Sequence, residues 1–142
     1  MKILVAVDGS KYSIDAVRFL TTNLTWAREQ PQIELLHVHA PVPKLSGLGA
    51  VIGKKQLERY YQEEGGEALA AAKQLLDAAK LPYNATILVG PPAETIVAHA
   101  KRWRADLLLI GHRGASAAAN MVLGSVASKL LQLSPVPVLL VK

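Results

Sequence analysis

The feature that most constrains the fold is a regular alternation of short apolar segments with longer segments of helical periodicity along the 142 residues. The short segments are rich in Val, Ile and Leu, as expected of strands that are buried on both faces. The longer segments repeat their apolar residues every three or four positions, which is typical of helices with one buried face. The alternation therefore predicts an α/β fold of parallel strands joined by right-handed helical crossovers.

We expect one domain, residues 1–142, with five strands and four helices. Ser10 is the expected N-cap of the first helix, whose apolar stripe continues through Leu24 to Ala27. Gly65 and Gly66 interrupt the second helix and are positions where it could bend. The expected strands are residues 2–7, 33–38, 84–89, 105–110 and 136–141, and the expected helices are residues 11–27, 54–80, 93–102 and a fourth that begins at 125.

A glycine-containing loop follows the fourth strand. Gly111 and Gly114 are separated by two residues, and Gly124 and Ser125 come nine residues later, immediately before a helical pattern. Glycine lets backbone amides approach a ligand closely, and a helix N-terminus presents unpaired N–H groups to an anion. The same residues would also suit an ordinary loop that ends in a Gly-Ser helix cap, so chemistry alone leaves phosphate binding and capping open.

Asp8 ends the first strand, as Gly111 ends the fourth. Ligands of parallel sheets bind beyond the carboxyl ends of the strands, where the strand order reverses. If Asp8 and the glycine loop serve one ligand, the first and fourth strands are neighbours, and the sheet order is 3-2-1-4-5. Asp8 could then be a general base, a magnesium ligand, an acceptor for ribose hydroxyls or a partner of loop amides.

Three motifs together resemble the universal stress protein family. They are the opening segment through Asp8-Gly9-Ser10, the Gly-x2-Gly-x9-Gly-Ser loop, and the final apolar strand, residues 134–142. The resemblance covers the whole chain and points to the ATP-binding branch, whose strand order is also 3-2-1-4-5. It implies that ATP, with Mg²⁺, contacts Val7, Asp8, the Val38 backbone, Gly111, His112, Arg113, Gly114, Gly124, Ser125, Val126 and Ala127.

Two departures from the family pattern bear on the expected function. Residues 115–120 are rich in alanine and lack a basic residue, and Ala127 stands where many members have a small polar residue. No catalytic residue is apparent, so the expected function is a nucleotide-dependent sensor with little or no turnover. The alternatives are a slow magnesium-dependent ATPase that uses Asp8, and a stress protein that binds a partner without a nucleotide.

The last strand predicts a homodimer. In order 3-2-1-4-5 it lies at a sheet edge, where Pro137 is tolerated because one side needs no N–H donor. An apolar edge invites pairing with a second chain, and the family resemblance implies the same dimer. The expected interface residues are Val136, Val138, Leu139, Leu140 and Val141.

Composition and the remaining motifs mainly exclude functions. The chain has no cysteine, and its net charge of +5 comes from basic residues spread along the sequence, so neither thiol chemistry nor nucleic-acid binding is expected. It has no signal peptide and no apolar run long enough to span a membrane, which predicts a cytoplasmic protein.

Gly47, Gly49 and Gly53 lack phosphate-loop spacing. His37 and His39 share one face of a strand but have no identifiable third metal ligand, so packing and hydrogen bonding are their expected roles.

Overall fold

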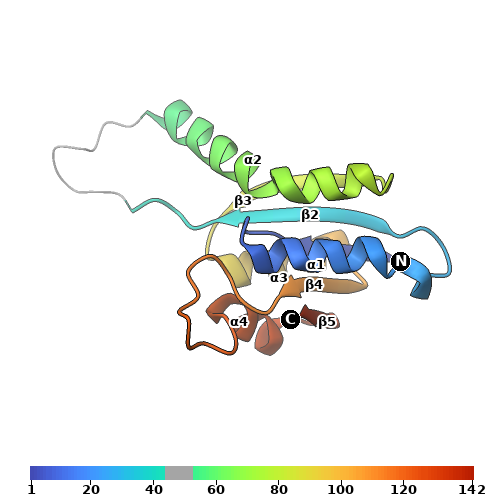
Figure 1. Cartoon of the computed structure of the whole chain (residues 1–142). Helices are drawn as coiled ribbons and strands as arrows, with labels where there is room; N and C mark the ends of the chain where they lie inside the picture. The colour runs from blue at the N-terminus through green and yellow to red at the C-terminus, as the bar shows by residue number, and fades with distance from the viewer. Residues whose placement is uncertain (44–52) are drawn as a thin grey trace.

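The computed structural model describes residues 1–43 and 53–142, which form a five-stranded parallel sheet with the order β3-β2-β1-β4-β5. The predicted fold class and strand order are therefore confirmed (Figure 1). The strands are β1 Lys2–Ala6, β2 Gln32–His39, β3 Tyr83–Val89, β4 Leu107–Gly111 and β5 Val138–Val141, and the α-helices are α1 Lys11–Thr22, α2 Lys54–Ala78, α3 Pro92–Trp103 and α4 Ser125–Leu133.

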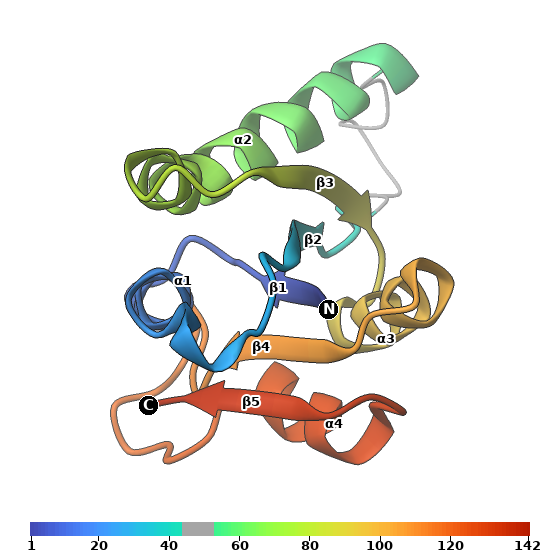
Figure 2. The same cartoon turned by 90° about the vertical axis from the view of Figure 1, so that its right-hand side faces the viewer.

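The sheet is covered by helices on both faces. Figure 2 shows α1 and α2 on one side of the strands and α3 and α4 on the other. Two apolar cores result, because alternate residues of each strand point to opposite faces: Ile3 belongs to the first core, and Leu4 to the second. Within residues 1–43 and 53–142, no helix combines the length and apolar character that crossing a membrane requires.

The central strand is the first in the sequence. β1 pairs with β2 from Lys2↔Gln32 to Ala6↔Leu36, and it pairs with β4 on its other side. The carboxyl ends of β1 and β4 therefore lie side by side. As a result, the turn after β1 and the long loop between β4 and α4 meet at one edge of the sheet.

The first helix is shorter than predicted. It ends at Thr22, and a 3₁₀ turn, Leu24–Trp26, follows it, so the expectation of a helix to Ala27 is wrong. The side-chain amide of Asn23 donates to the Phe19 carbonyl at 3.0 Å, which satisfies an orphan group of the helix end. Leu24 still packs on the first core, and this explains why the apolar periodicity continued past the helix.

The last strand is also shorter than predicted, since it begins at Val138 rather than Val136. Pro137 precedes it, and its carbonyl accepts a hydrogen bond from Leu108 N at 2.9 Å. Proline has no N–H to contribute to a ladder, so its position at the start of an edge strand leaves the sheet intact.

The two glycines of α2 have different surroundings. An added Cβ at Gly65 would lie 2.7 Å from the Ile87 side chain on β3, whereas at Gly66 it would meet open space. Gly65 therefore allows the helix to pack closely on the strand. Figure 1 shows that α2 changes direction near its middle, where the pair lies, in agreement with the predicted bend.

Candidate functional site

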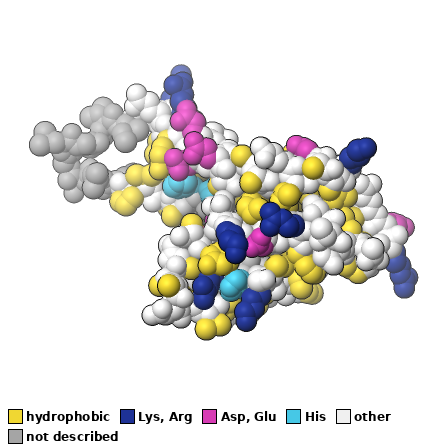
Figure 3. All heavy atoms as spheres, in the orientation of Figure 1, with side chains coloured by type: hydrophobic (Ala, Val, Ile, Leu, Met, Phe, Trp, Pro, Cys, Tyr) yellow, Lys and Arg dark blue, Asp and Glu magenta, His cyan; other side chains and the backbone are white. Residues whose placement is uncertain are grey.

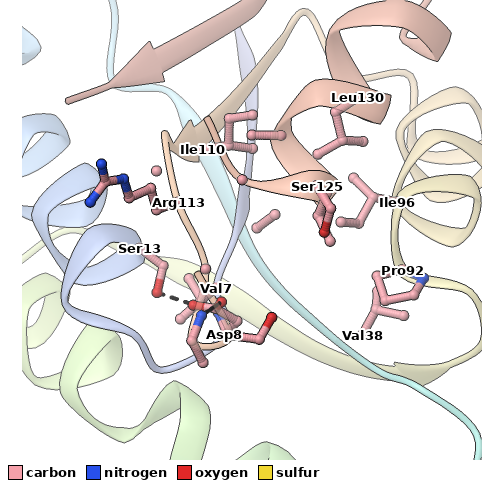
Figure 4. A pocket seen from close by; sticks show the side chains of 18 of the residues that line it. Val7, Asp8, Ser13, Val38, Pro92, Ile96, Ile110, Arg113, Ser125 and Leu130 are labelled. Atoms are coloured by element: carbon pink, nitrogen blue, oxygen red, sulfur yellow. Dashed lines mark hydrogen bonds between the residues drawn. The ribbon is translucent and has the colours of Figure 1, made fainter. Parts of the chain in front are cut away.

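A cavity of about 400 Å³ lies at the carboxyl ends of β1, β2 and β4 (Figure 4). It occupies the place where the strand order of the sheet reverses, which is where open α/β sheets bind ligands. Of the eleven residues predicted to contact a ligand, His112 alone does not line it. The ten that do are Val7, Asp8, Val38, Gly111, Arg113, Gly114, Gly124, Ser125, Val126 and Ala127.

Asp8 joins the two loops that meet at this edge. Its Oδ1 accepts a hydrogen bond from Ser10 N at 3.0 Å, and its Oδ2 accepts one from Ala115 N at 2.9 Å. Its own backbone N–H donates to Ser13 Oγ at 3.3 Å. The carboxylate thus ties the turn after β1 to the loop after β4, although the two segments are 107 residues apart.

These contacts also set the charge of Asp8. Partial desolvation raises the pKa of its carboxyl group, but the hydrogen bonds from Ser10, Ala115 and Ser13 lower it by more, so the pKa lies below its ordinary value of 3.8. Asp8 is therefore a carboxylate at neutral pH. A carboxylate that is already stabilised by several donors is a weak proton acceptor, which disfavours the general-base role.

Three glycines permit close contacts between segments at the cavity. An added Cβ at Gly111 would lie 2.5 Å from the Tyr12 carbonyl oxygen, and one at Gly114 would lie 2.8 Å from Asp8 Oδ2. At Gly124 it would lie 3.1 Å from the Cα of Arg113, which brings the start of α4 against the loop after β4. Each glycine therefore makes room for a neighbouring segment of the chain.

The first turn of α4 presents backbone donors to the cavity. Its N-cap is Gly124, which has no side chain to bond the N–H groups of Ser125, Val126 and Ala127. Those three groups precede the first intrahelical bond, from Ser128 N to the Gly124 carbonyl at 2.9 Å. Together with the Ser125 hydroxyl and the positive end of the helix dipole, they form a donor set that suits an anion.

An apolar wall faces these donors. Figure 4 shows Val38, Pro92, Ile96 and Leu130 on the side of the cavity opposite Asp8 and Ser13, with Ser125 between the two groups. Pro92 and Ile96 come from α3, and Leu130 comes from α4. An apolar slot beside polar donors suits a ligand that has a flat, hydrophobic part and a charged part.

Sequence reasoning missed most of this wall. In the sequence, Ile96 and Leu130 have the spacing of residues on the buried face of a helix. That spacing is the same whether the residue faces a cavity or a packed core. The lining residues that were not predicted are Ala6, Ser13, Leu36, His37, His39, Ala40, Pro92, Ile96, Ile110, Ala115, Ser116, Ala117, Met121 and Leu130.

The backbone of Val38 faces the cavity because β2 is longer than β1. The pairing of β1 with β2 ends at Ala6↔Leu36, and the Leu36 carbonyl accepts from Val7 N at 2.9 Å. Backbone groups two residues apart on a strand point to the same side, so the amide and carbonyl of Val38 point to the side where β1 has ended. They are placed to pair with an edge of a ligand that lies in the cavity.

His112 and Arg113 direct their side chains elsewhere. The His112 ring packs edge-on against Tyr12, and its Nδ1 lies 3.2 Å from the Val141 carbonyl oxygen, so it does not reach the cavity. The guanidinium of Arg113 lies over the Tyr12 ring at 5.8 Å from its centroid. Figure 4 shows it extending away from Val38 and Ser125, so Arg113 contributes its backbone rather than a phosphate-binding cation.

His37 has the hydrogen-bonding role that the sequence predicted. Its Nδ1 lies 2.8 Å from the Val7 carbonyl oxygen, and the ring is buried. His39 packs against Tyr60 and Tyr61. No cluster of three or more metal-ligating side chains occurs in the described part of the chain. Of the segment that superficially resembles a phosphate loop, Gly47 and Gly49 lie outside the described residues.

Comparisons with known proteins agree with this geometry. The sequence profile described as the Universal stress protein family matches residues 1–142. Universal stress protein YxiE of Bacillus subtilis is 34% identical over 99% of this chain and 98% of its own length. The universal stress protein UspA from Lactobacillus plantarum superposes with a TM-score of 0.80 at 22% identity, covering 100% of this chain and 97% of that one. A universal stress protein solved in complex with cAMP has a TM-score of 0.68 at 25% identity, covering 100% and 97%.

Proposed function

Because the chain belongs to the universal stress protein family, we propose that its cavity binds an adenine nucleotide, ATP with Mg²⁺, and makes the protein a nucleotide-dependent regulatory module in the stress response. The observation that carries the proposal is the pairing of two unlike walls in one cavity. Open amide donors at the start of α4 suit phosphate, and the apolar slot beside Val38 suits a purine ring. The relative solved with cAMP supports an adenine nucleotide as the ligand class.

Three groups of residues in the cavity would bind the base, the ribose and the phosphates of the nucleotide. The Val38 backbone would pair with the edge of the base, with Pro92 and Ile96 against its face. Asp8 would accept hydrogen bonds from ribose hydroxyls, because its carboxylate has lone pairs beyond the two that bond Ser10 N and Ala115 N. The phosphates would take the amides of the α4 first turn and the hydroxyl of Ser125.

Among the described residues that line the cavity, Asp8 is the one that could hold Mg²⁺. Asp8 is the one carboxylate among the described residues that line the cavity, and hard carboxylate oxygens suit this cation. Bound Mg²⁺ would neutralise part of the phosphate charge, which no described lysine or arginine side chain does inside the cavity. Asp8 would hold it directly or through water.

The test starts with the protein as purified from cells. Mass spectrometry of the material released by denaturation should show an adenine nucleotide. Calorimetric titration of the emptied protein should then show one site for ATP, with GTP as the matched control for the base. A protein that carries no nucleotide and gives no heat with ATP, AMP or cAMP would remove this proposal and favour a partner-binding role without a nucleotide.

Little or no hydrolysis is expected. Asp8, the one carboxylate among the described residues that line the cavity, is engaged by two amides, so it is poorly suited to accept a proton from water. Phosphate release from MgATP, measured with Asp8→Asn as the control, decides between a sensor and a slow ATPase. Turnover that falls in Asp8→Asn while ATP still binds would establish the ATPase.

We also propose that two chains associate through β5. This strand pairs only with β4 among the described strands, and its four residues are half-buried. The carbonyls of Pro137 and Val141 bond β4, so by alternation the N–H groups of Val138 and Leu140 point outward. A second copy could pair with these groups across a two-fold axis.

The core contacts of β5 decide which variants can test the dimer. Leu139 packs on the first core and Leu140 on the second, so aspartate at either position would unfold the chain rather than report on an interface. Val138→Pro removes one outward N–H and keeps a similar apolar volume, whereas Leu139→Pro removes an N–H that points toward β4. Light scattering should show a dimer that Val138→Pro weakens, while Leu139→Pro should mainly lower stability. A monomeric wild-type protein at micromolar concentration would refute the dimer.

A further inference from the structure

The side chains of His37 and His39 leave the same ring nitrogen available on both residues. Nδ1 of His37 lies 2.8 Å from the Val7 carbonyl oxygen, and Nδ1 of His39 lies 2.6 Å from the Ala40 carbonyl oxygen. A carbonyl oxygen can only accept, so Nδ1 carries the proton in each ring. The Nε2 atom of each neutral imidazole then has a free lone pair, which is the form of histidine that binds metal ions.

This arrangement is the usual outer support of a metal-binding histidine. Ligating imidazoles commonly donate their second N–H to a carbonyl or carboxylate, which fixes both the tautomer and the orientation of the ring. His37 is 7% exposed and is held by the end of β1, and His39 is packed against Tyr60 and Tyr61 at centroid distances of 5.6 and 5.1 Å. Both rings are therefore positioned by their surroundings.

The two rings are also close enough to share an ion. They lie two residues apart on β2, on one face of the strand, with centroids 6.1 Å apart, and both line the cavity. With metal–nitrogen bonds of about 2.1 Å, two imidazoles on one ion have centroids roughly 5.3 Å apart at a tetrahedral angle and roughly 6.5 Å apart when they bind on opposite sides of the ion. The observed 6.1 Å therefore fits a wide N–metal–N angle, whereas a tetrahedral site requires the half-buried His39 ring to turn toward His37 and away from the Ala40 carbonyl oxygen.

We propose that His37 and His39 form a two-imidazole site for a divalent transition metal ion of the Cu²⁺, Ni²⁺ and Zn²⁺ class. Imidazole suits these ions better than Mg²⁺, so the site is distinct from the one that a magnesium nucleotide would use. No third histidine, cysteine or acidic side chain joins the pair within residues 1–43 and 53–142. The remaining coordination positions therefore belong to water or to a ligand in the cavity, as in metal sites that keep an open position.

The other two histidines of the chain provide internal controls. Both nitrogens of His99 are engaged, Nε2 with Glu34 Oε1 at 2.6 Å and Nδ1 with the Arg102 guanidinium at 2.9 Å, so this ring cannot ligate. His112 has the same Nδ1 pairing with a carbonyl as the proposed ligands. It lies outside the cavity lining and has no described histidine beside it. Figure 3 shows histidine atoms (cyan) as two separate groups on this face, one beside the first half of α2 and one near basic side chains.

The experiment is calorimetric titration of the untagged full chain, free of nucleotide, with Cu²⁺, Ni²⁺, Zn²⁺ and Mg²⁺. We expect one ion per chain, with Cu²⁺ tightest, as the general affinity order for nitrogen ligands requires, and no comparable binding of Mg²⁺. Loss of an outer-shell partner alone weakens metal sites by about 10–100-fold, so His37→Gln and His39→Gln should each weaken binding by at least about tenfold. His112→Gln, the matched control, should leave the affinity unchanged.

A second measurement needs no substitution, which matters because His37 is buried. Imidazole ¹⁵N resonances of the wild-type protein should shift on addition of Zn²⁺ at Nε2 of two histidines, and at neither Nδ1. The proposal is overturned if Cu²⁺ and Ni²⁺ give no saturable binding, if His112→Gln weakens binding as much as His39→Gln, or if the perturbed resonances belong to other histidines. Nucleotide binding can succeed or fail without changing any of these results, so the two proposals are tested separately.

Discussion

Helices α1 and α4 begin at the same edge of the sheet, but their first turns are completed in different ways. At α1, Ser10 Oγ accepts a hydrogen bond from Ser13 N at 3.3 Å, and Ser13 Oγ donates to the Ser10 carbonyl at 3.0 Å. At α4 the N-cap is Gly124, which offers no side-chain acceptor. The first helix has a side-chain acceptor for one amide of its first turn, whereas the second has none and leaves its three first-turn amides at a cavity.

The difference shows how one fold separates stability from binding. A side-chain cap typically stabilises a helix by about 1 kcal/mol relative to alanine but by only a few tenths relative to glycine, so Gly124 leaves the end of α4 open at little cost. At α4 the donors that would have received a cap remain available to an anion. Both helix ends are held together by Asp8 and by the close approach of Gly111 to Tyr12, so a change at this contact affects both.

The largest effect should come from Gly111→Ala, which breaks the contact between the two helix ends. A Cβ there would lie 2.5 Å from a backbone oxygen of Tyr12 and 2.6 Å from its carbonyl carbon. Backbone atoms cannot move aside as a flexible side chain can, so we expect a loss of about 1–3 kcal/mol in the free energy of unfolding, measured by urea denaturation. Gly66→Ala, where the space is open, should be neutral or stabilising by up to about 1 kcal/mol. Equal behaviour of the two variants would contradict the assigned contact.

Gly124→Asp should make the start of α4 resemble that of α1. The new carboxylate would bond the first-turn amides and repel phosphate, so ATP affinity should fall by more than about tenfold while the protein stays folded. Gly124→Ala is the control, since its Cβ also meets the Arg113 backbone at 3.1 Å but brings no acceptor. Because the Cβ points at that backbone, valine at this position would displace the loop after β4 rather than fill the phosphate space. Calorimetry measures the affinities, and circular dichroism verifies the fold.

Alanine substitutions at Ser10 and Ser125 should distinguish the role of the α1 end in stability from the role of the α4 end in ligand binding. Ser10→Ala removes a side-chain cap and should cost about 1 kcal/mol of unfolding free energy. Ser125→Ala removes one ligand donor and should leave stability unchanged, but weaken ATP binding by roughly fivefold, corresponding to about 1 kcal/mol. Thermal unfolding and titration of both variants form a complete comparison. If Ser125→Ala altered stability alone, the hydroxyl would have a structural role instead.

The smallest expected effect is the pH dependence of the stability that Asp8 provides. The folded-state pKa of Asp8 is lowered by its hydrogen bonds, so the stabilisation they provide is fully present above the unfolded value of about 3.8 and decreases as the pH falls below it. Asp8→Asn should therefore destabilise the protein at pH 6, and its difference from the wild type should shrink toward pH 3. Urea denaturation at several pH values measures this. A difference that does not depend on pH would show that Asp8 acts through shape rather than charge.

Sequence patterns were sufficient for the sheet and for one wall of the cavity. The alternation of apolar segments indicated the parallel sheet, and Asp8 and the glycine loop indicated which strand ends meet. The end of α1 was misplaced because Leu24 continues the apolar period, although Asn23 has already closed the helix. Local polar groups decide where a helix stops, and periodicity alone does not show them.

The opposite wall and the loop side chains depend on tertiary contacts. Ile96 and Leu130 have the spacing of ordinary core residues, and only packing shows that they border a cavity. Arg113 lies in the glycine loop, where a cation would suit phosphate, but the ring of Tyr12 on another element draws it away. The resemblance to a family indicated the position of His112 but not the direction of its side chain.

The position of β1 also has a consequence for how the protein is made. Of the five strands of this sheet, the one that comes first in the chain lies at the centre. Its neighbour β4 pairs with it directly, and Asp106 N, just before β4, donates to the Lys2 carbonyl at 2.8 Å. The two halves of the cavity therefore leave the ribosome several seconds apart at usual synthesis rates. A nascent chain that has not yet reached β4 lacks the half of the cavity that we propose binds phosphate. If the proposal holds, a nucleotide stabilises only a chain whose last quarter has folded onto β1.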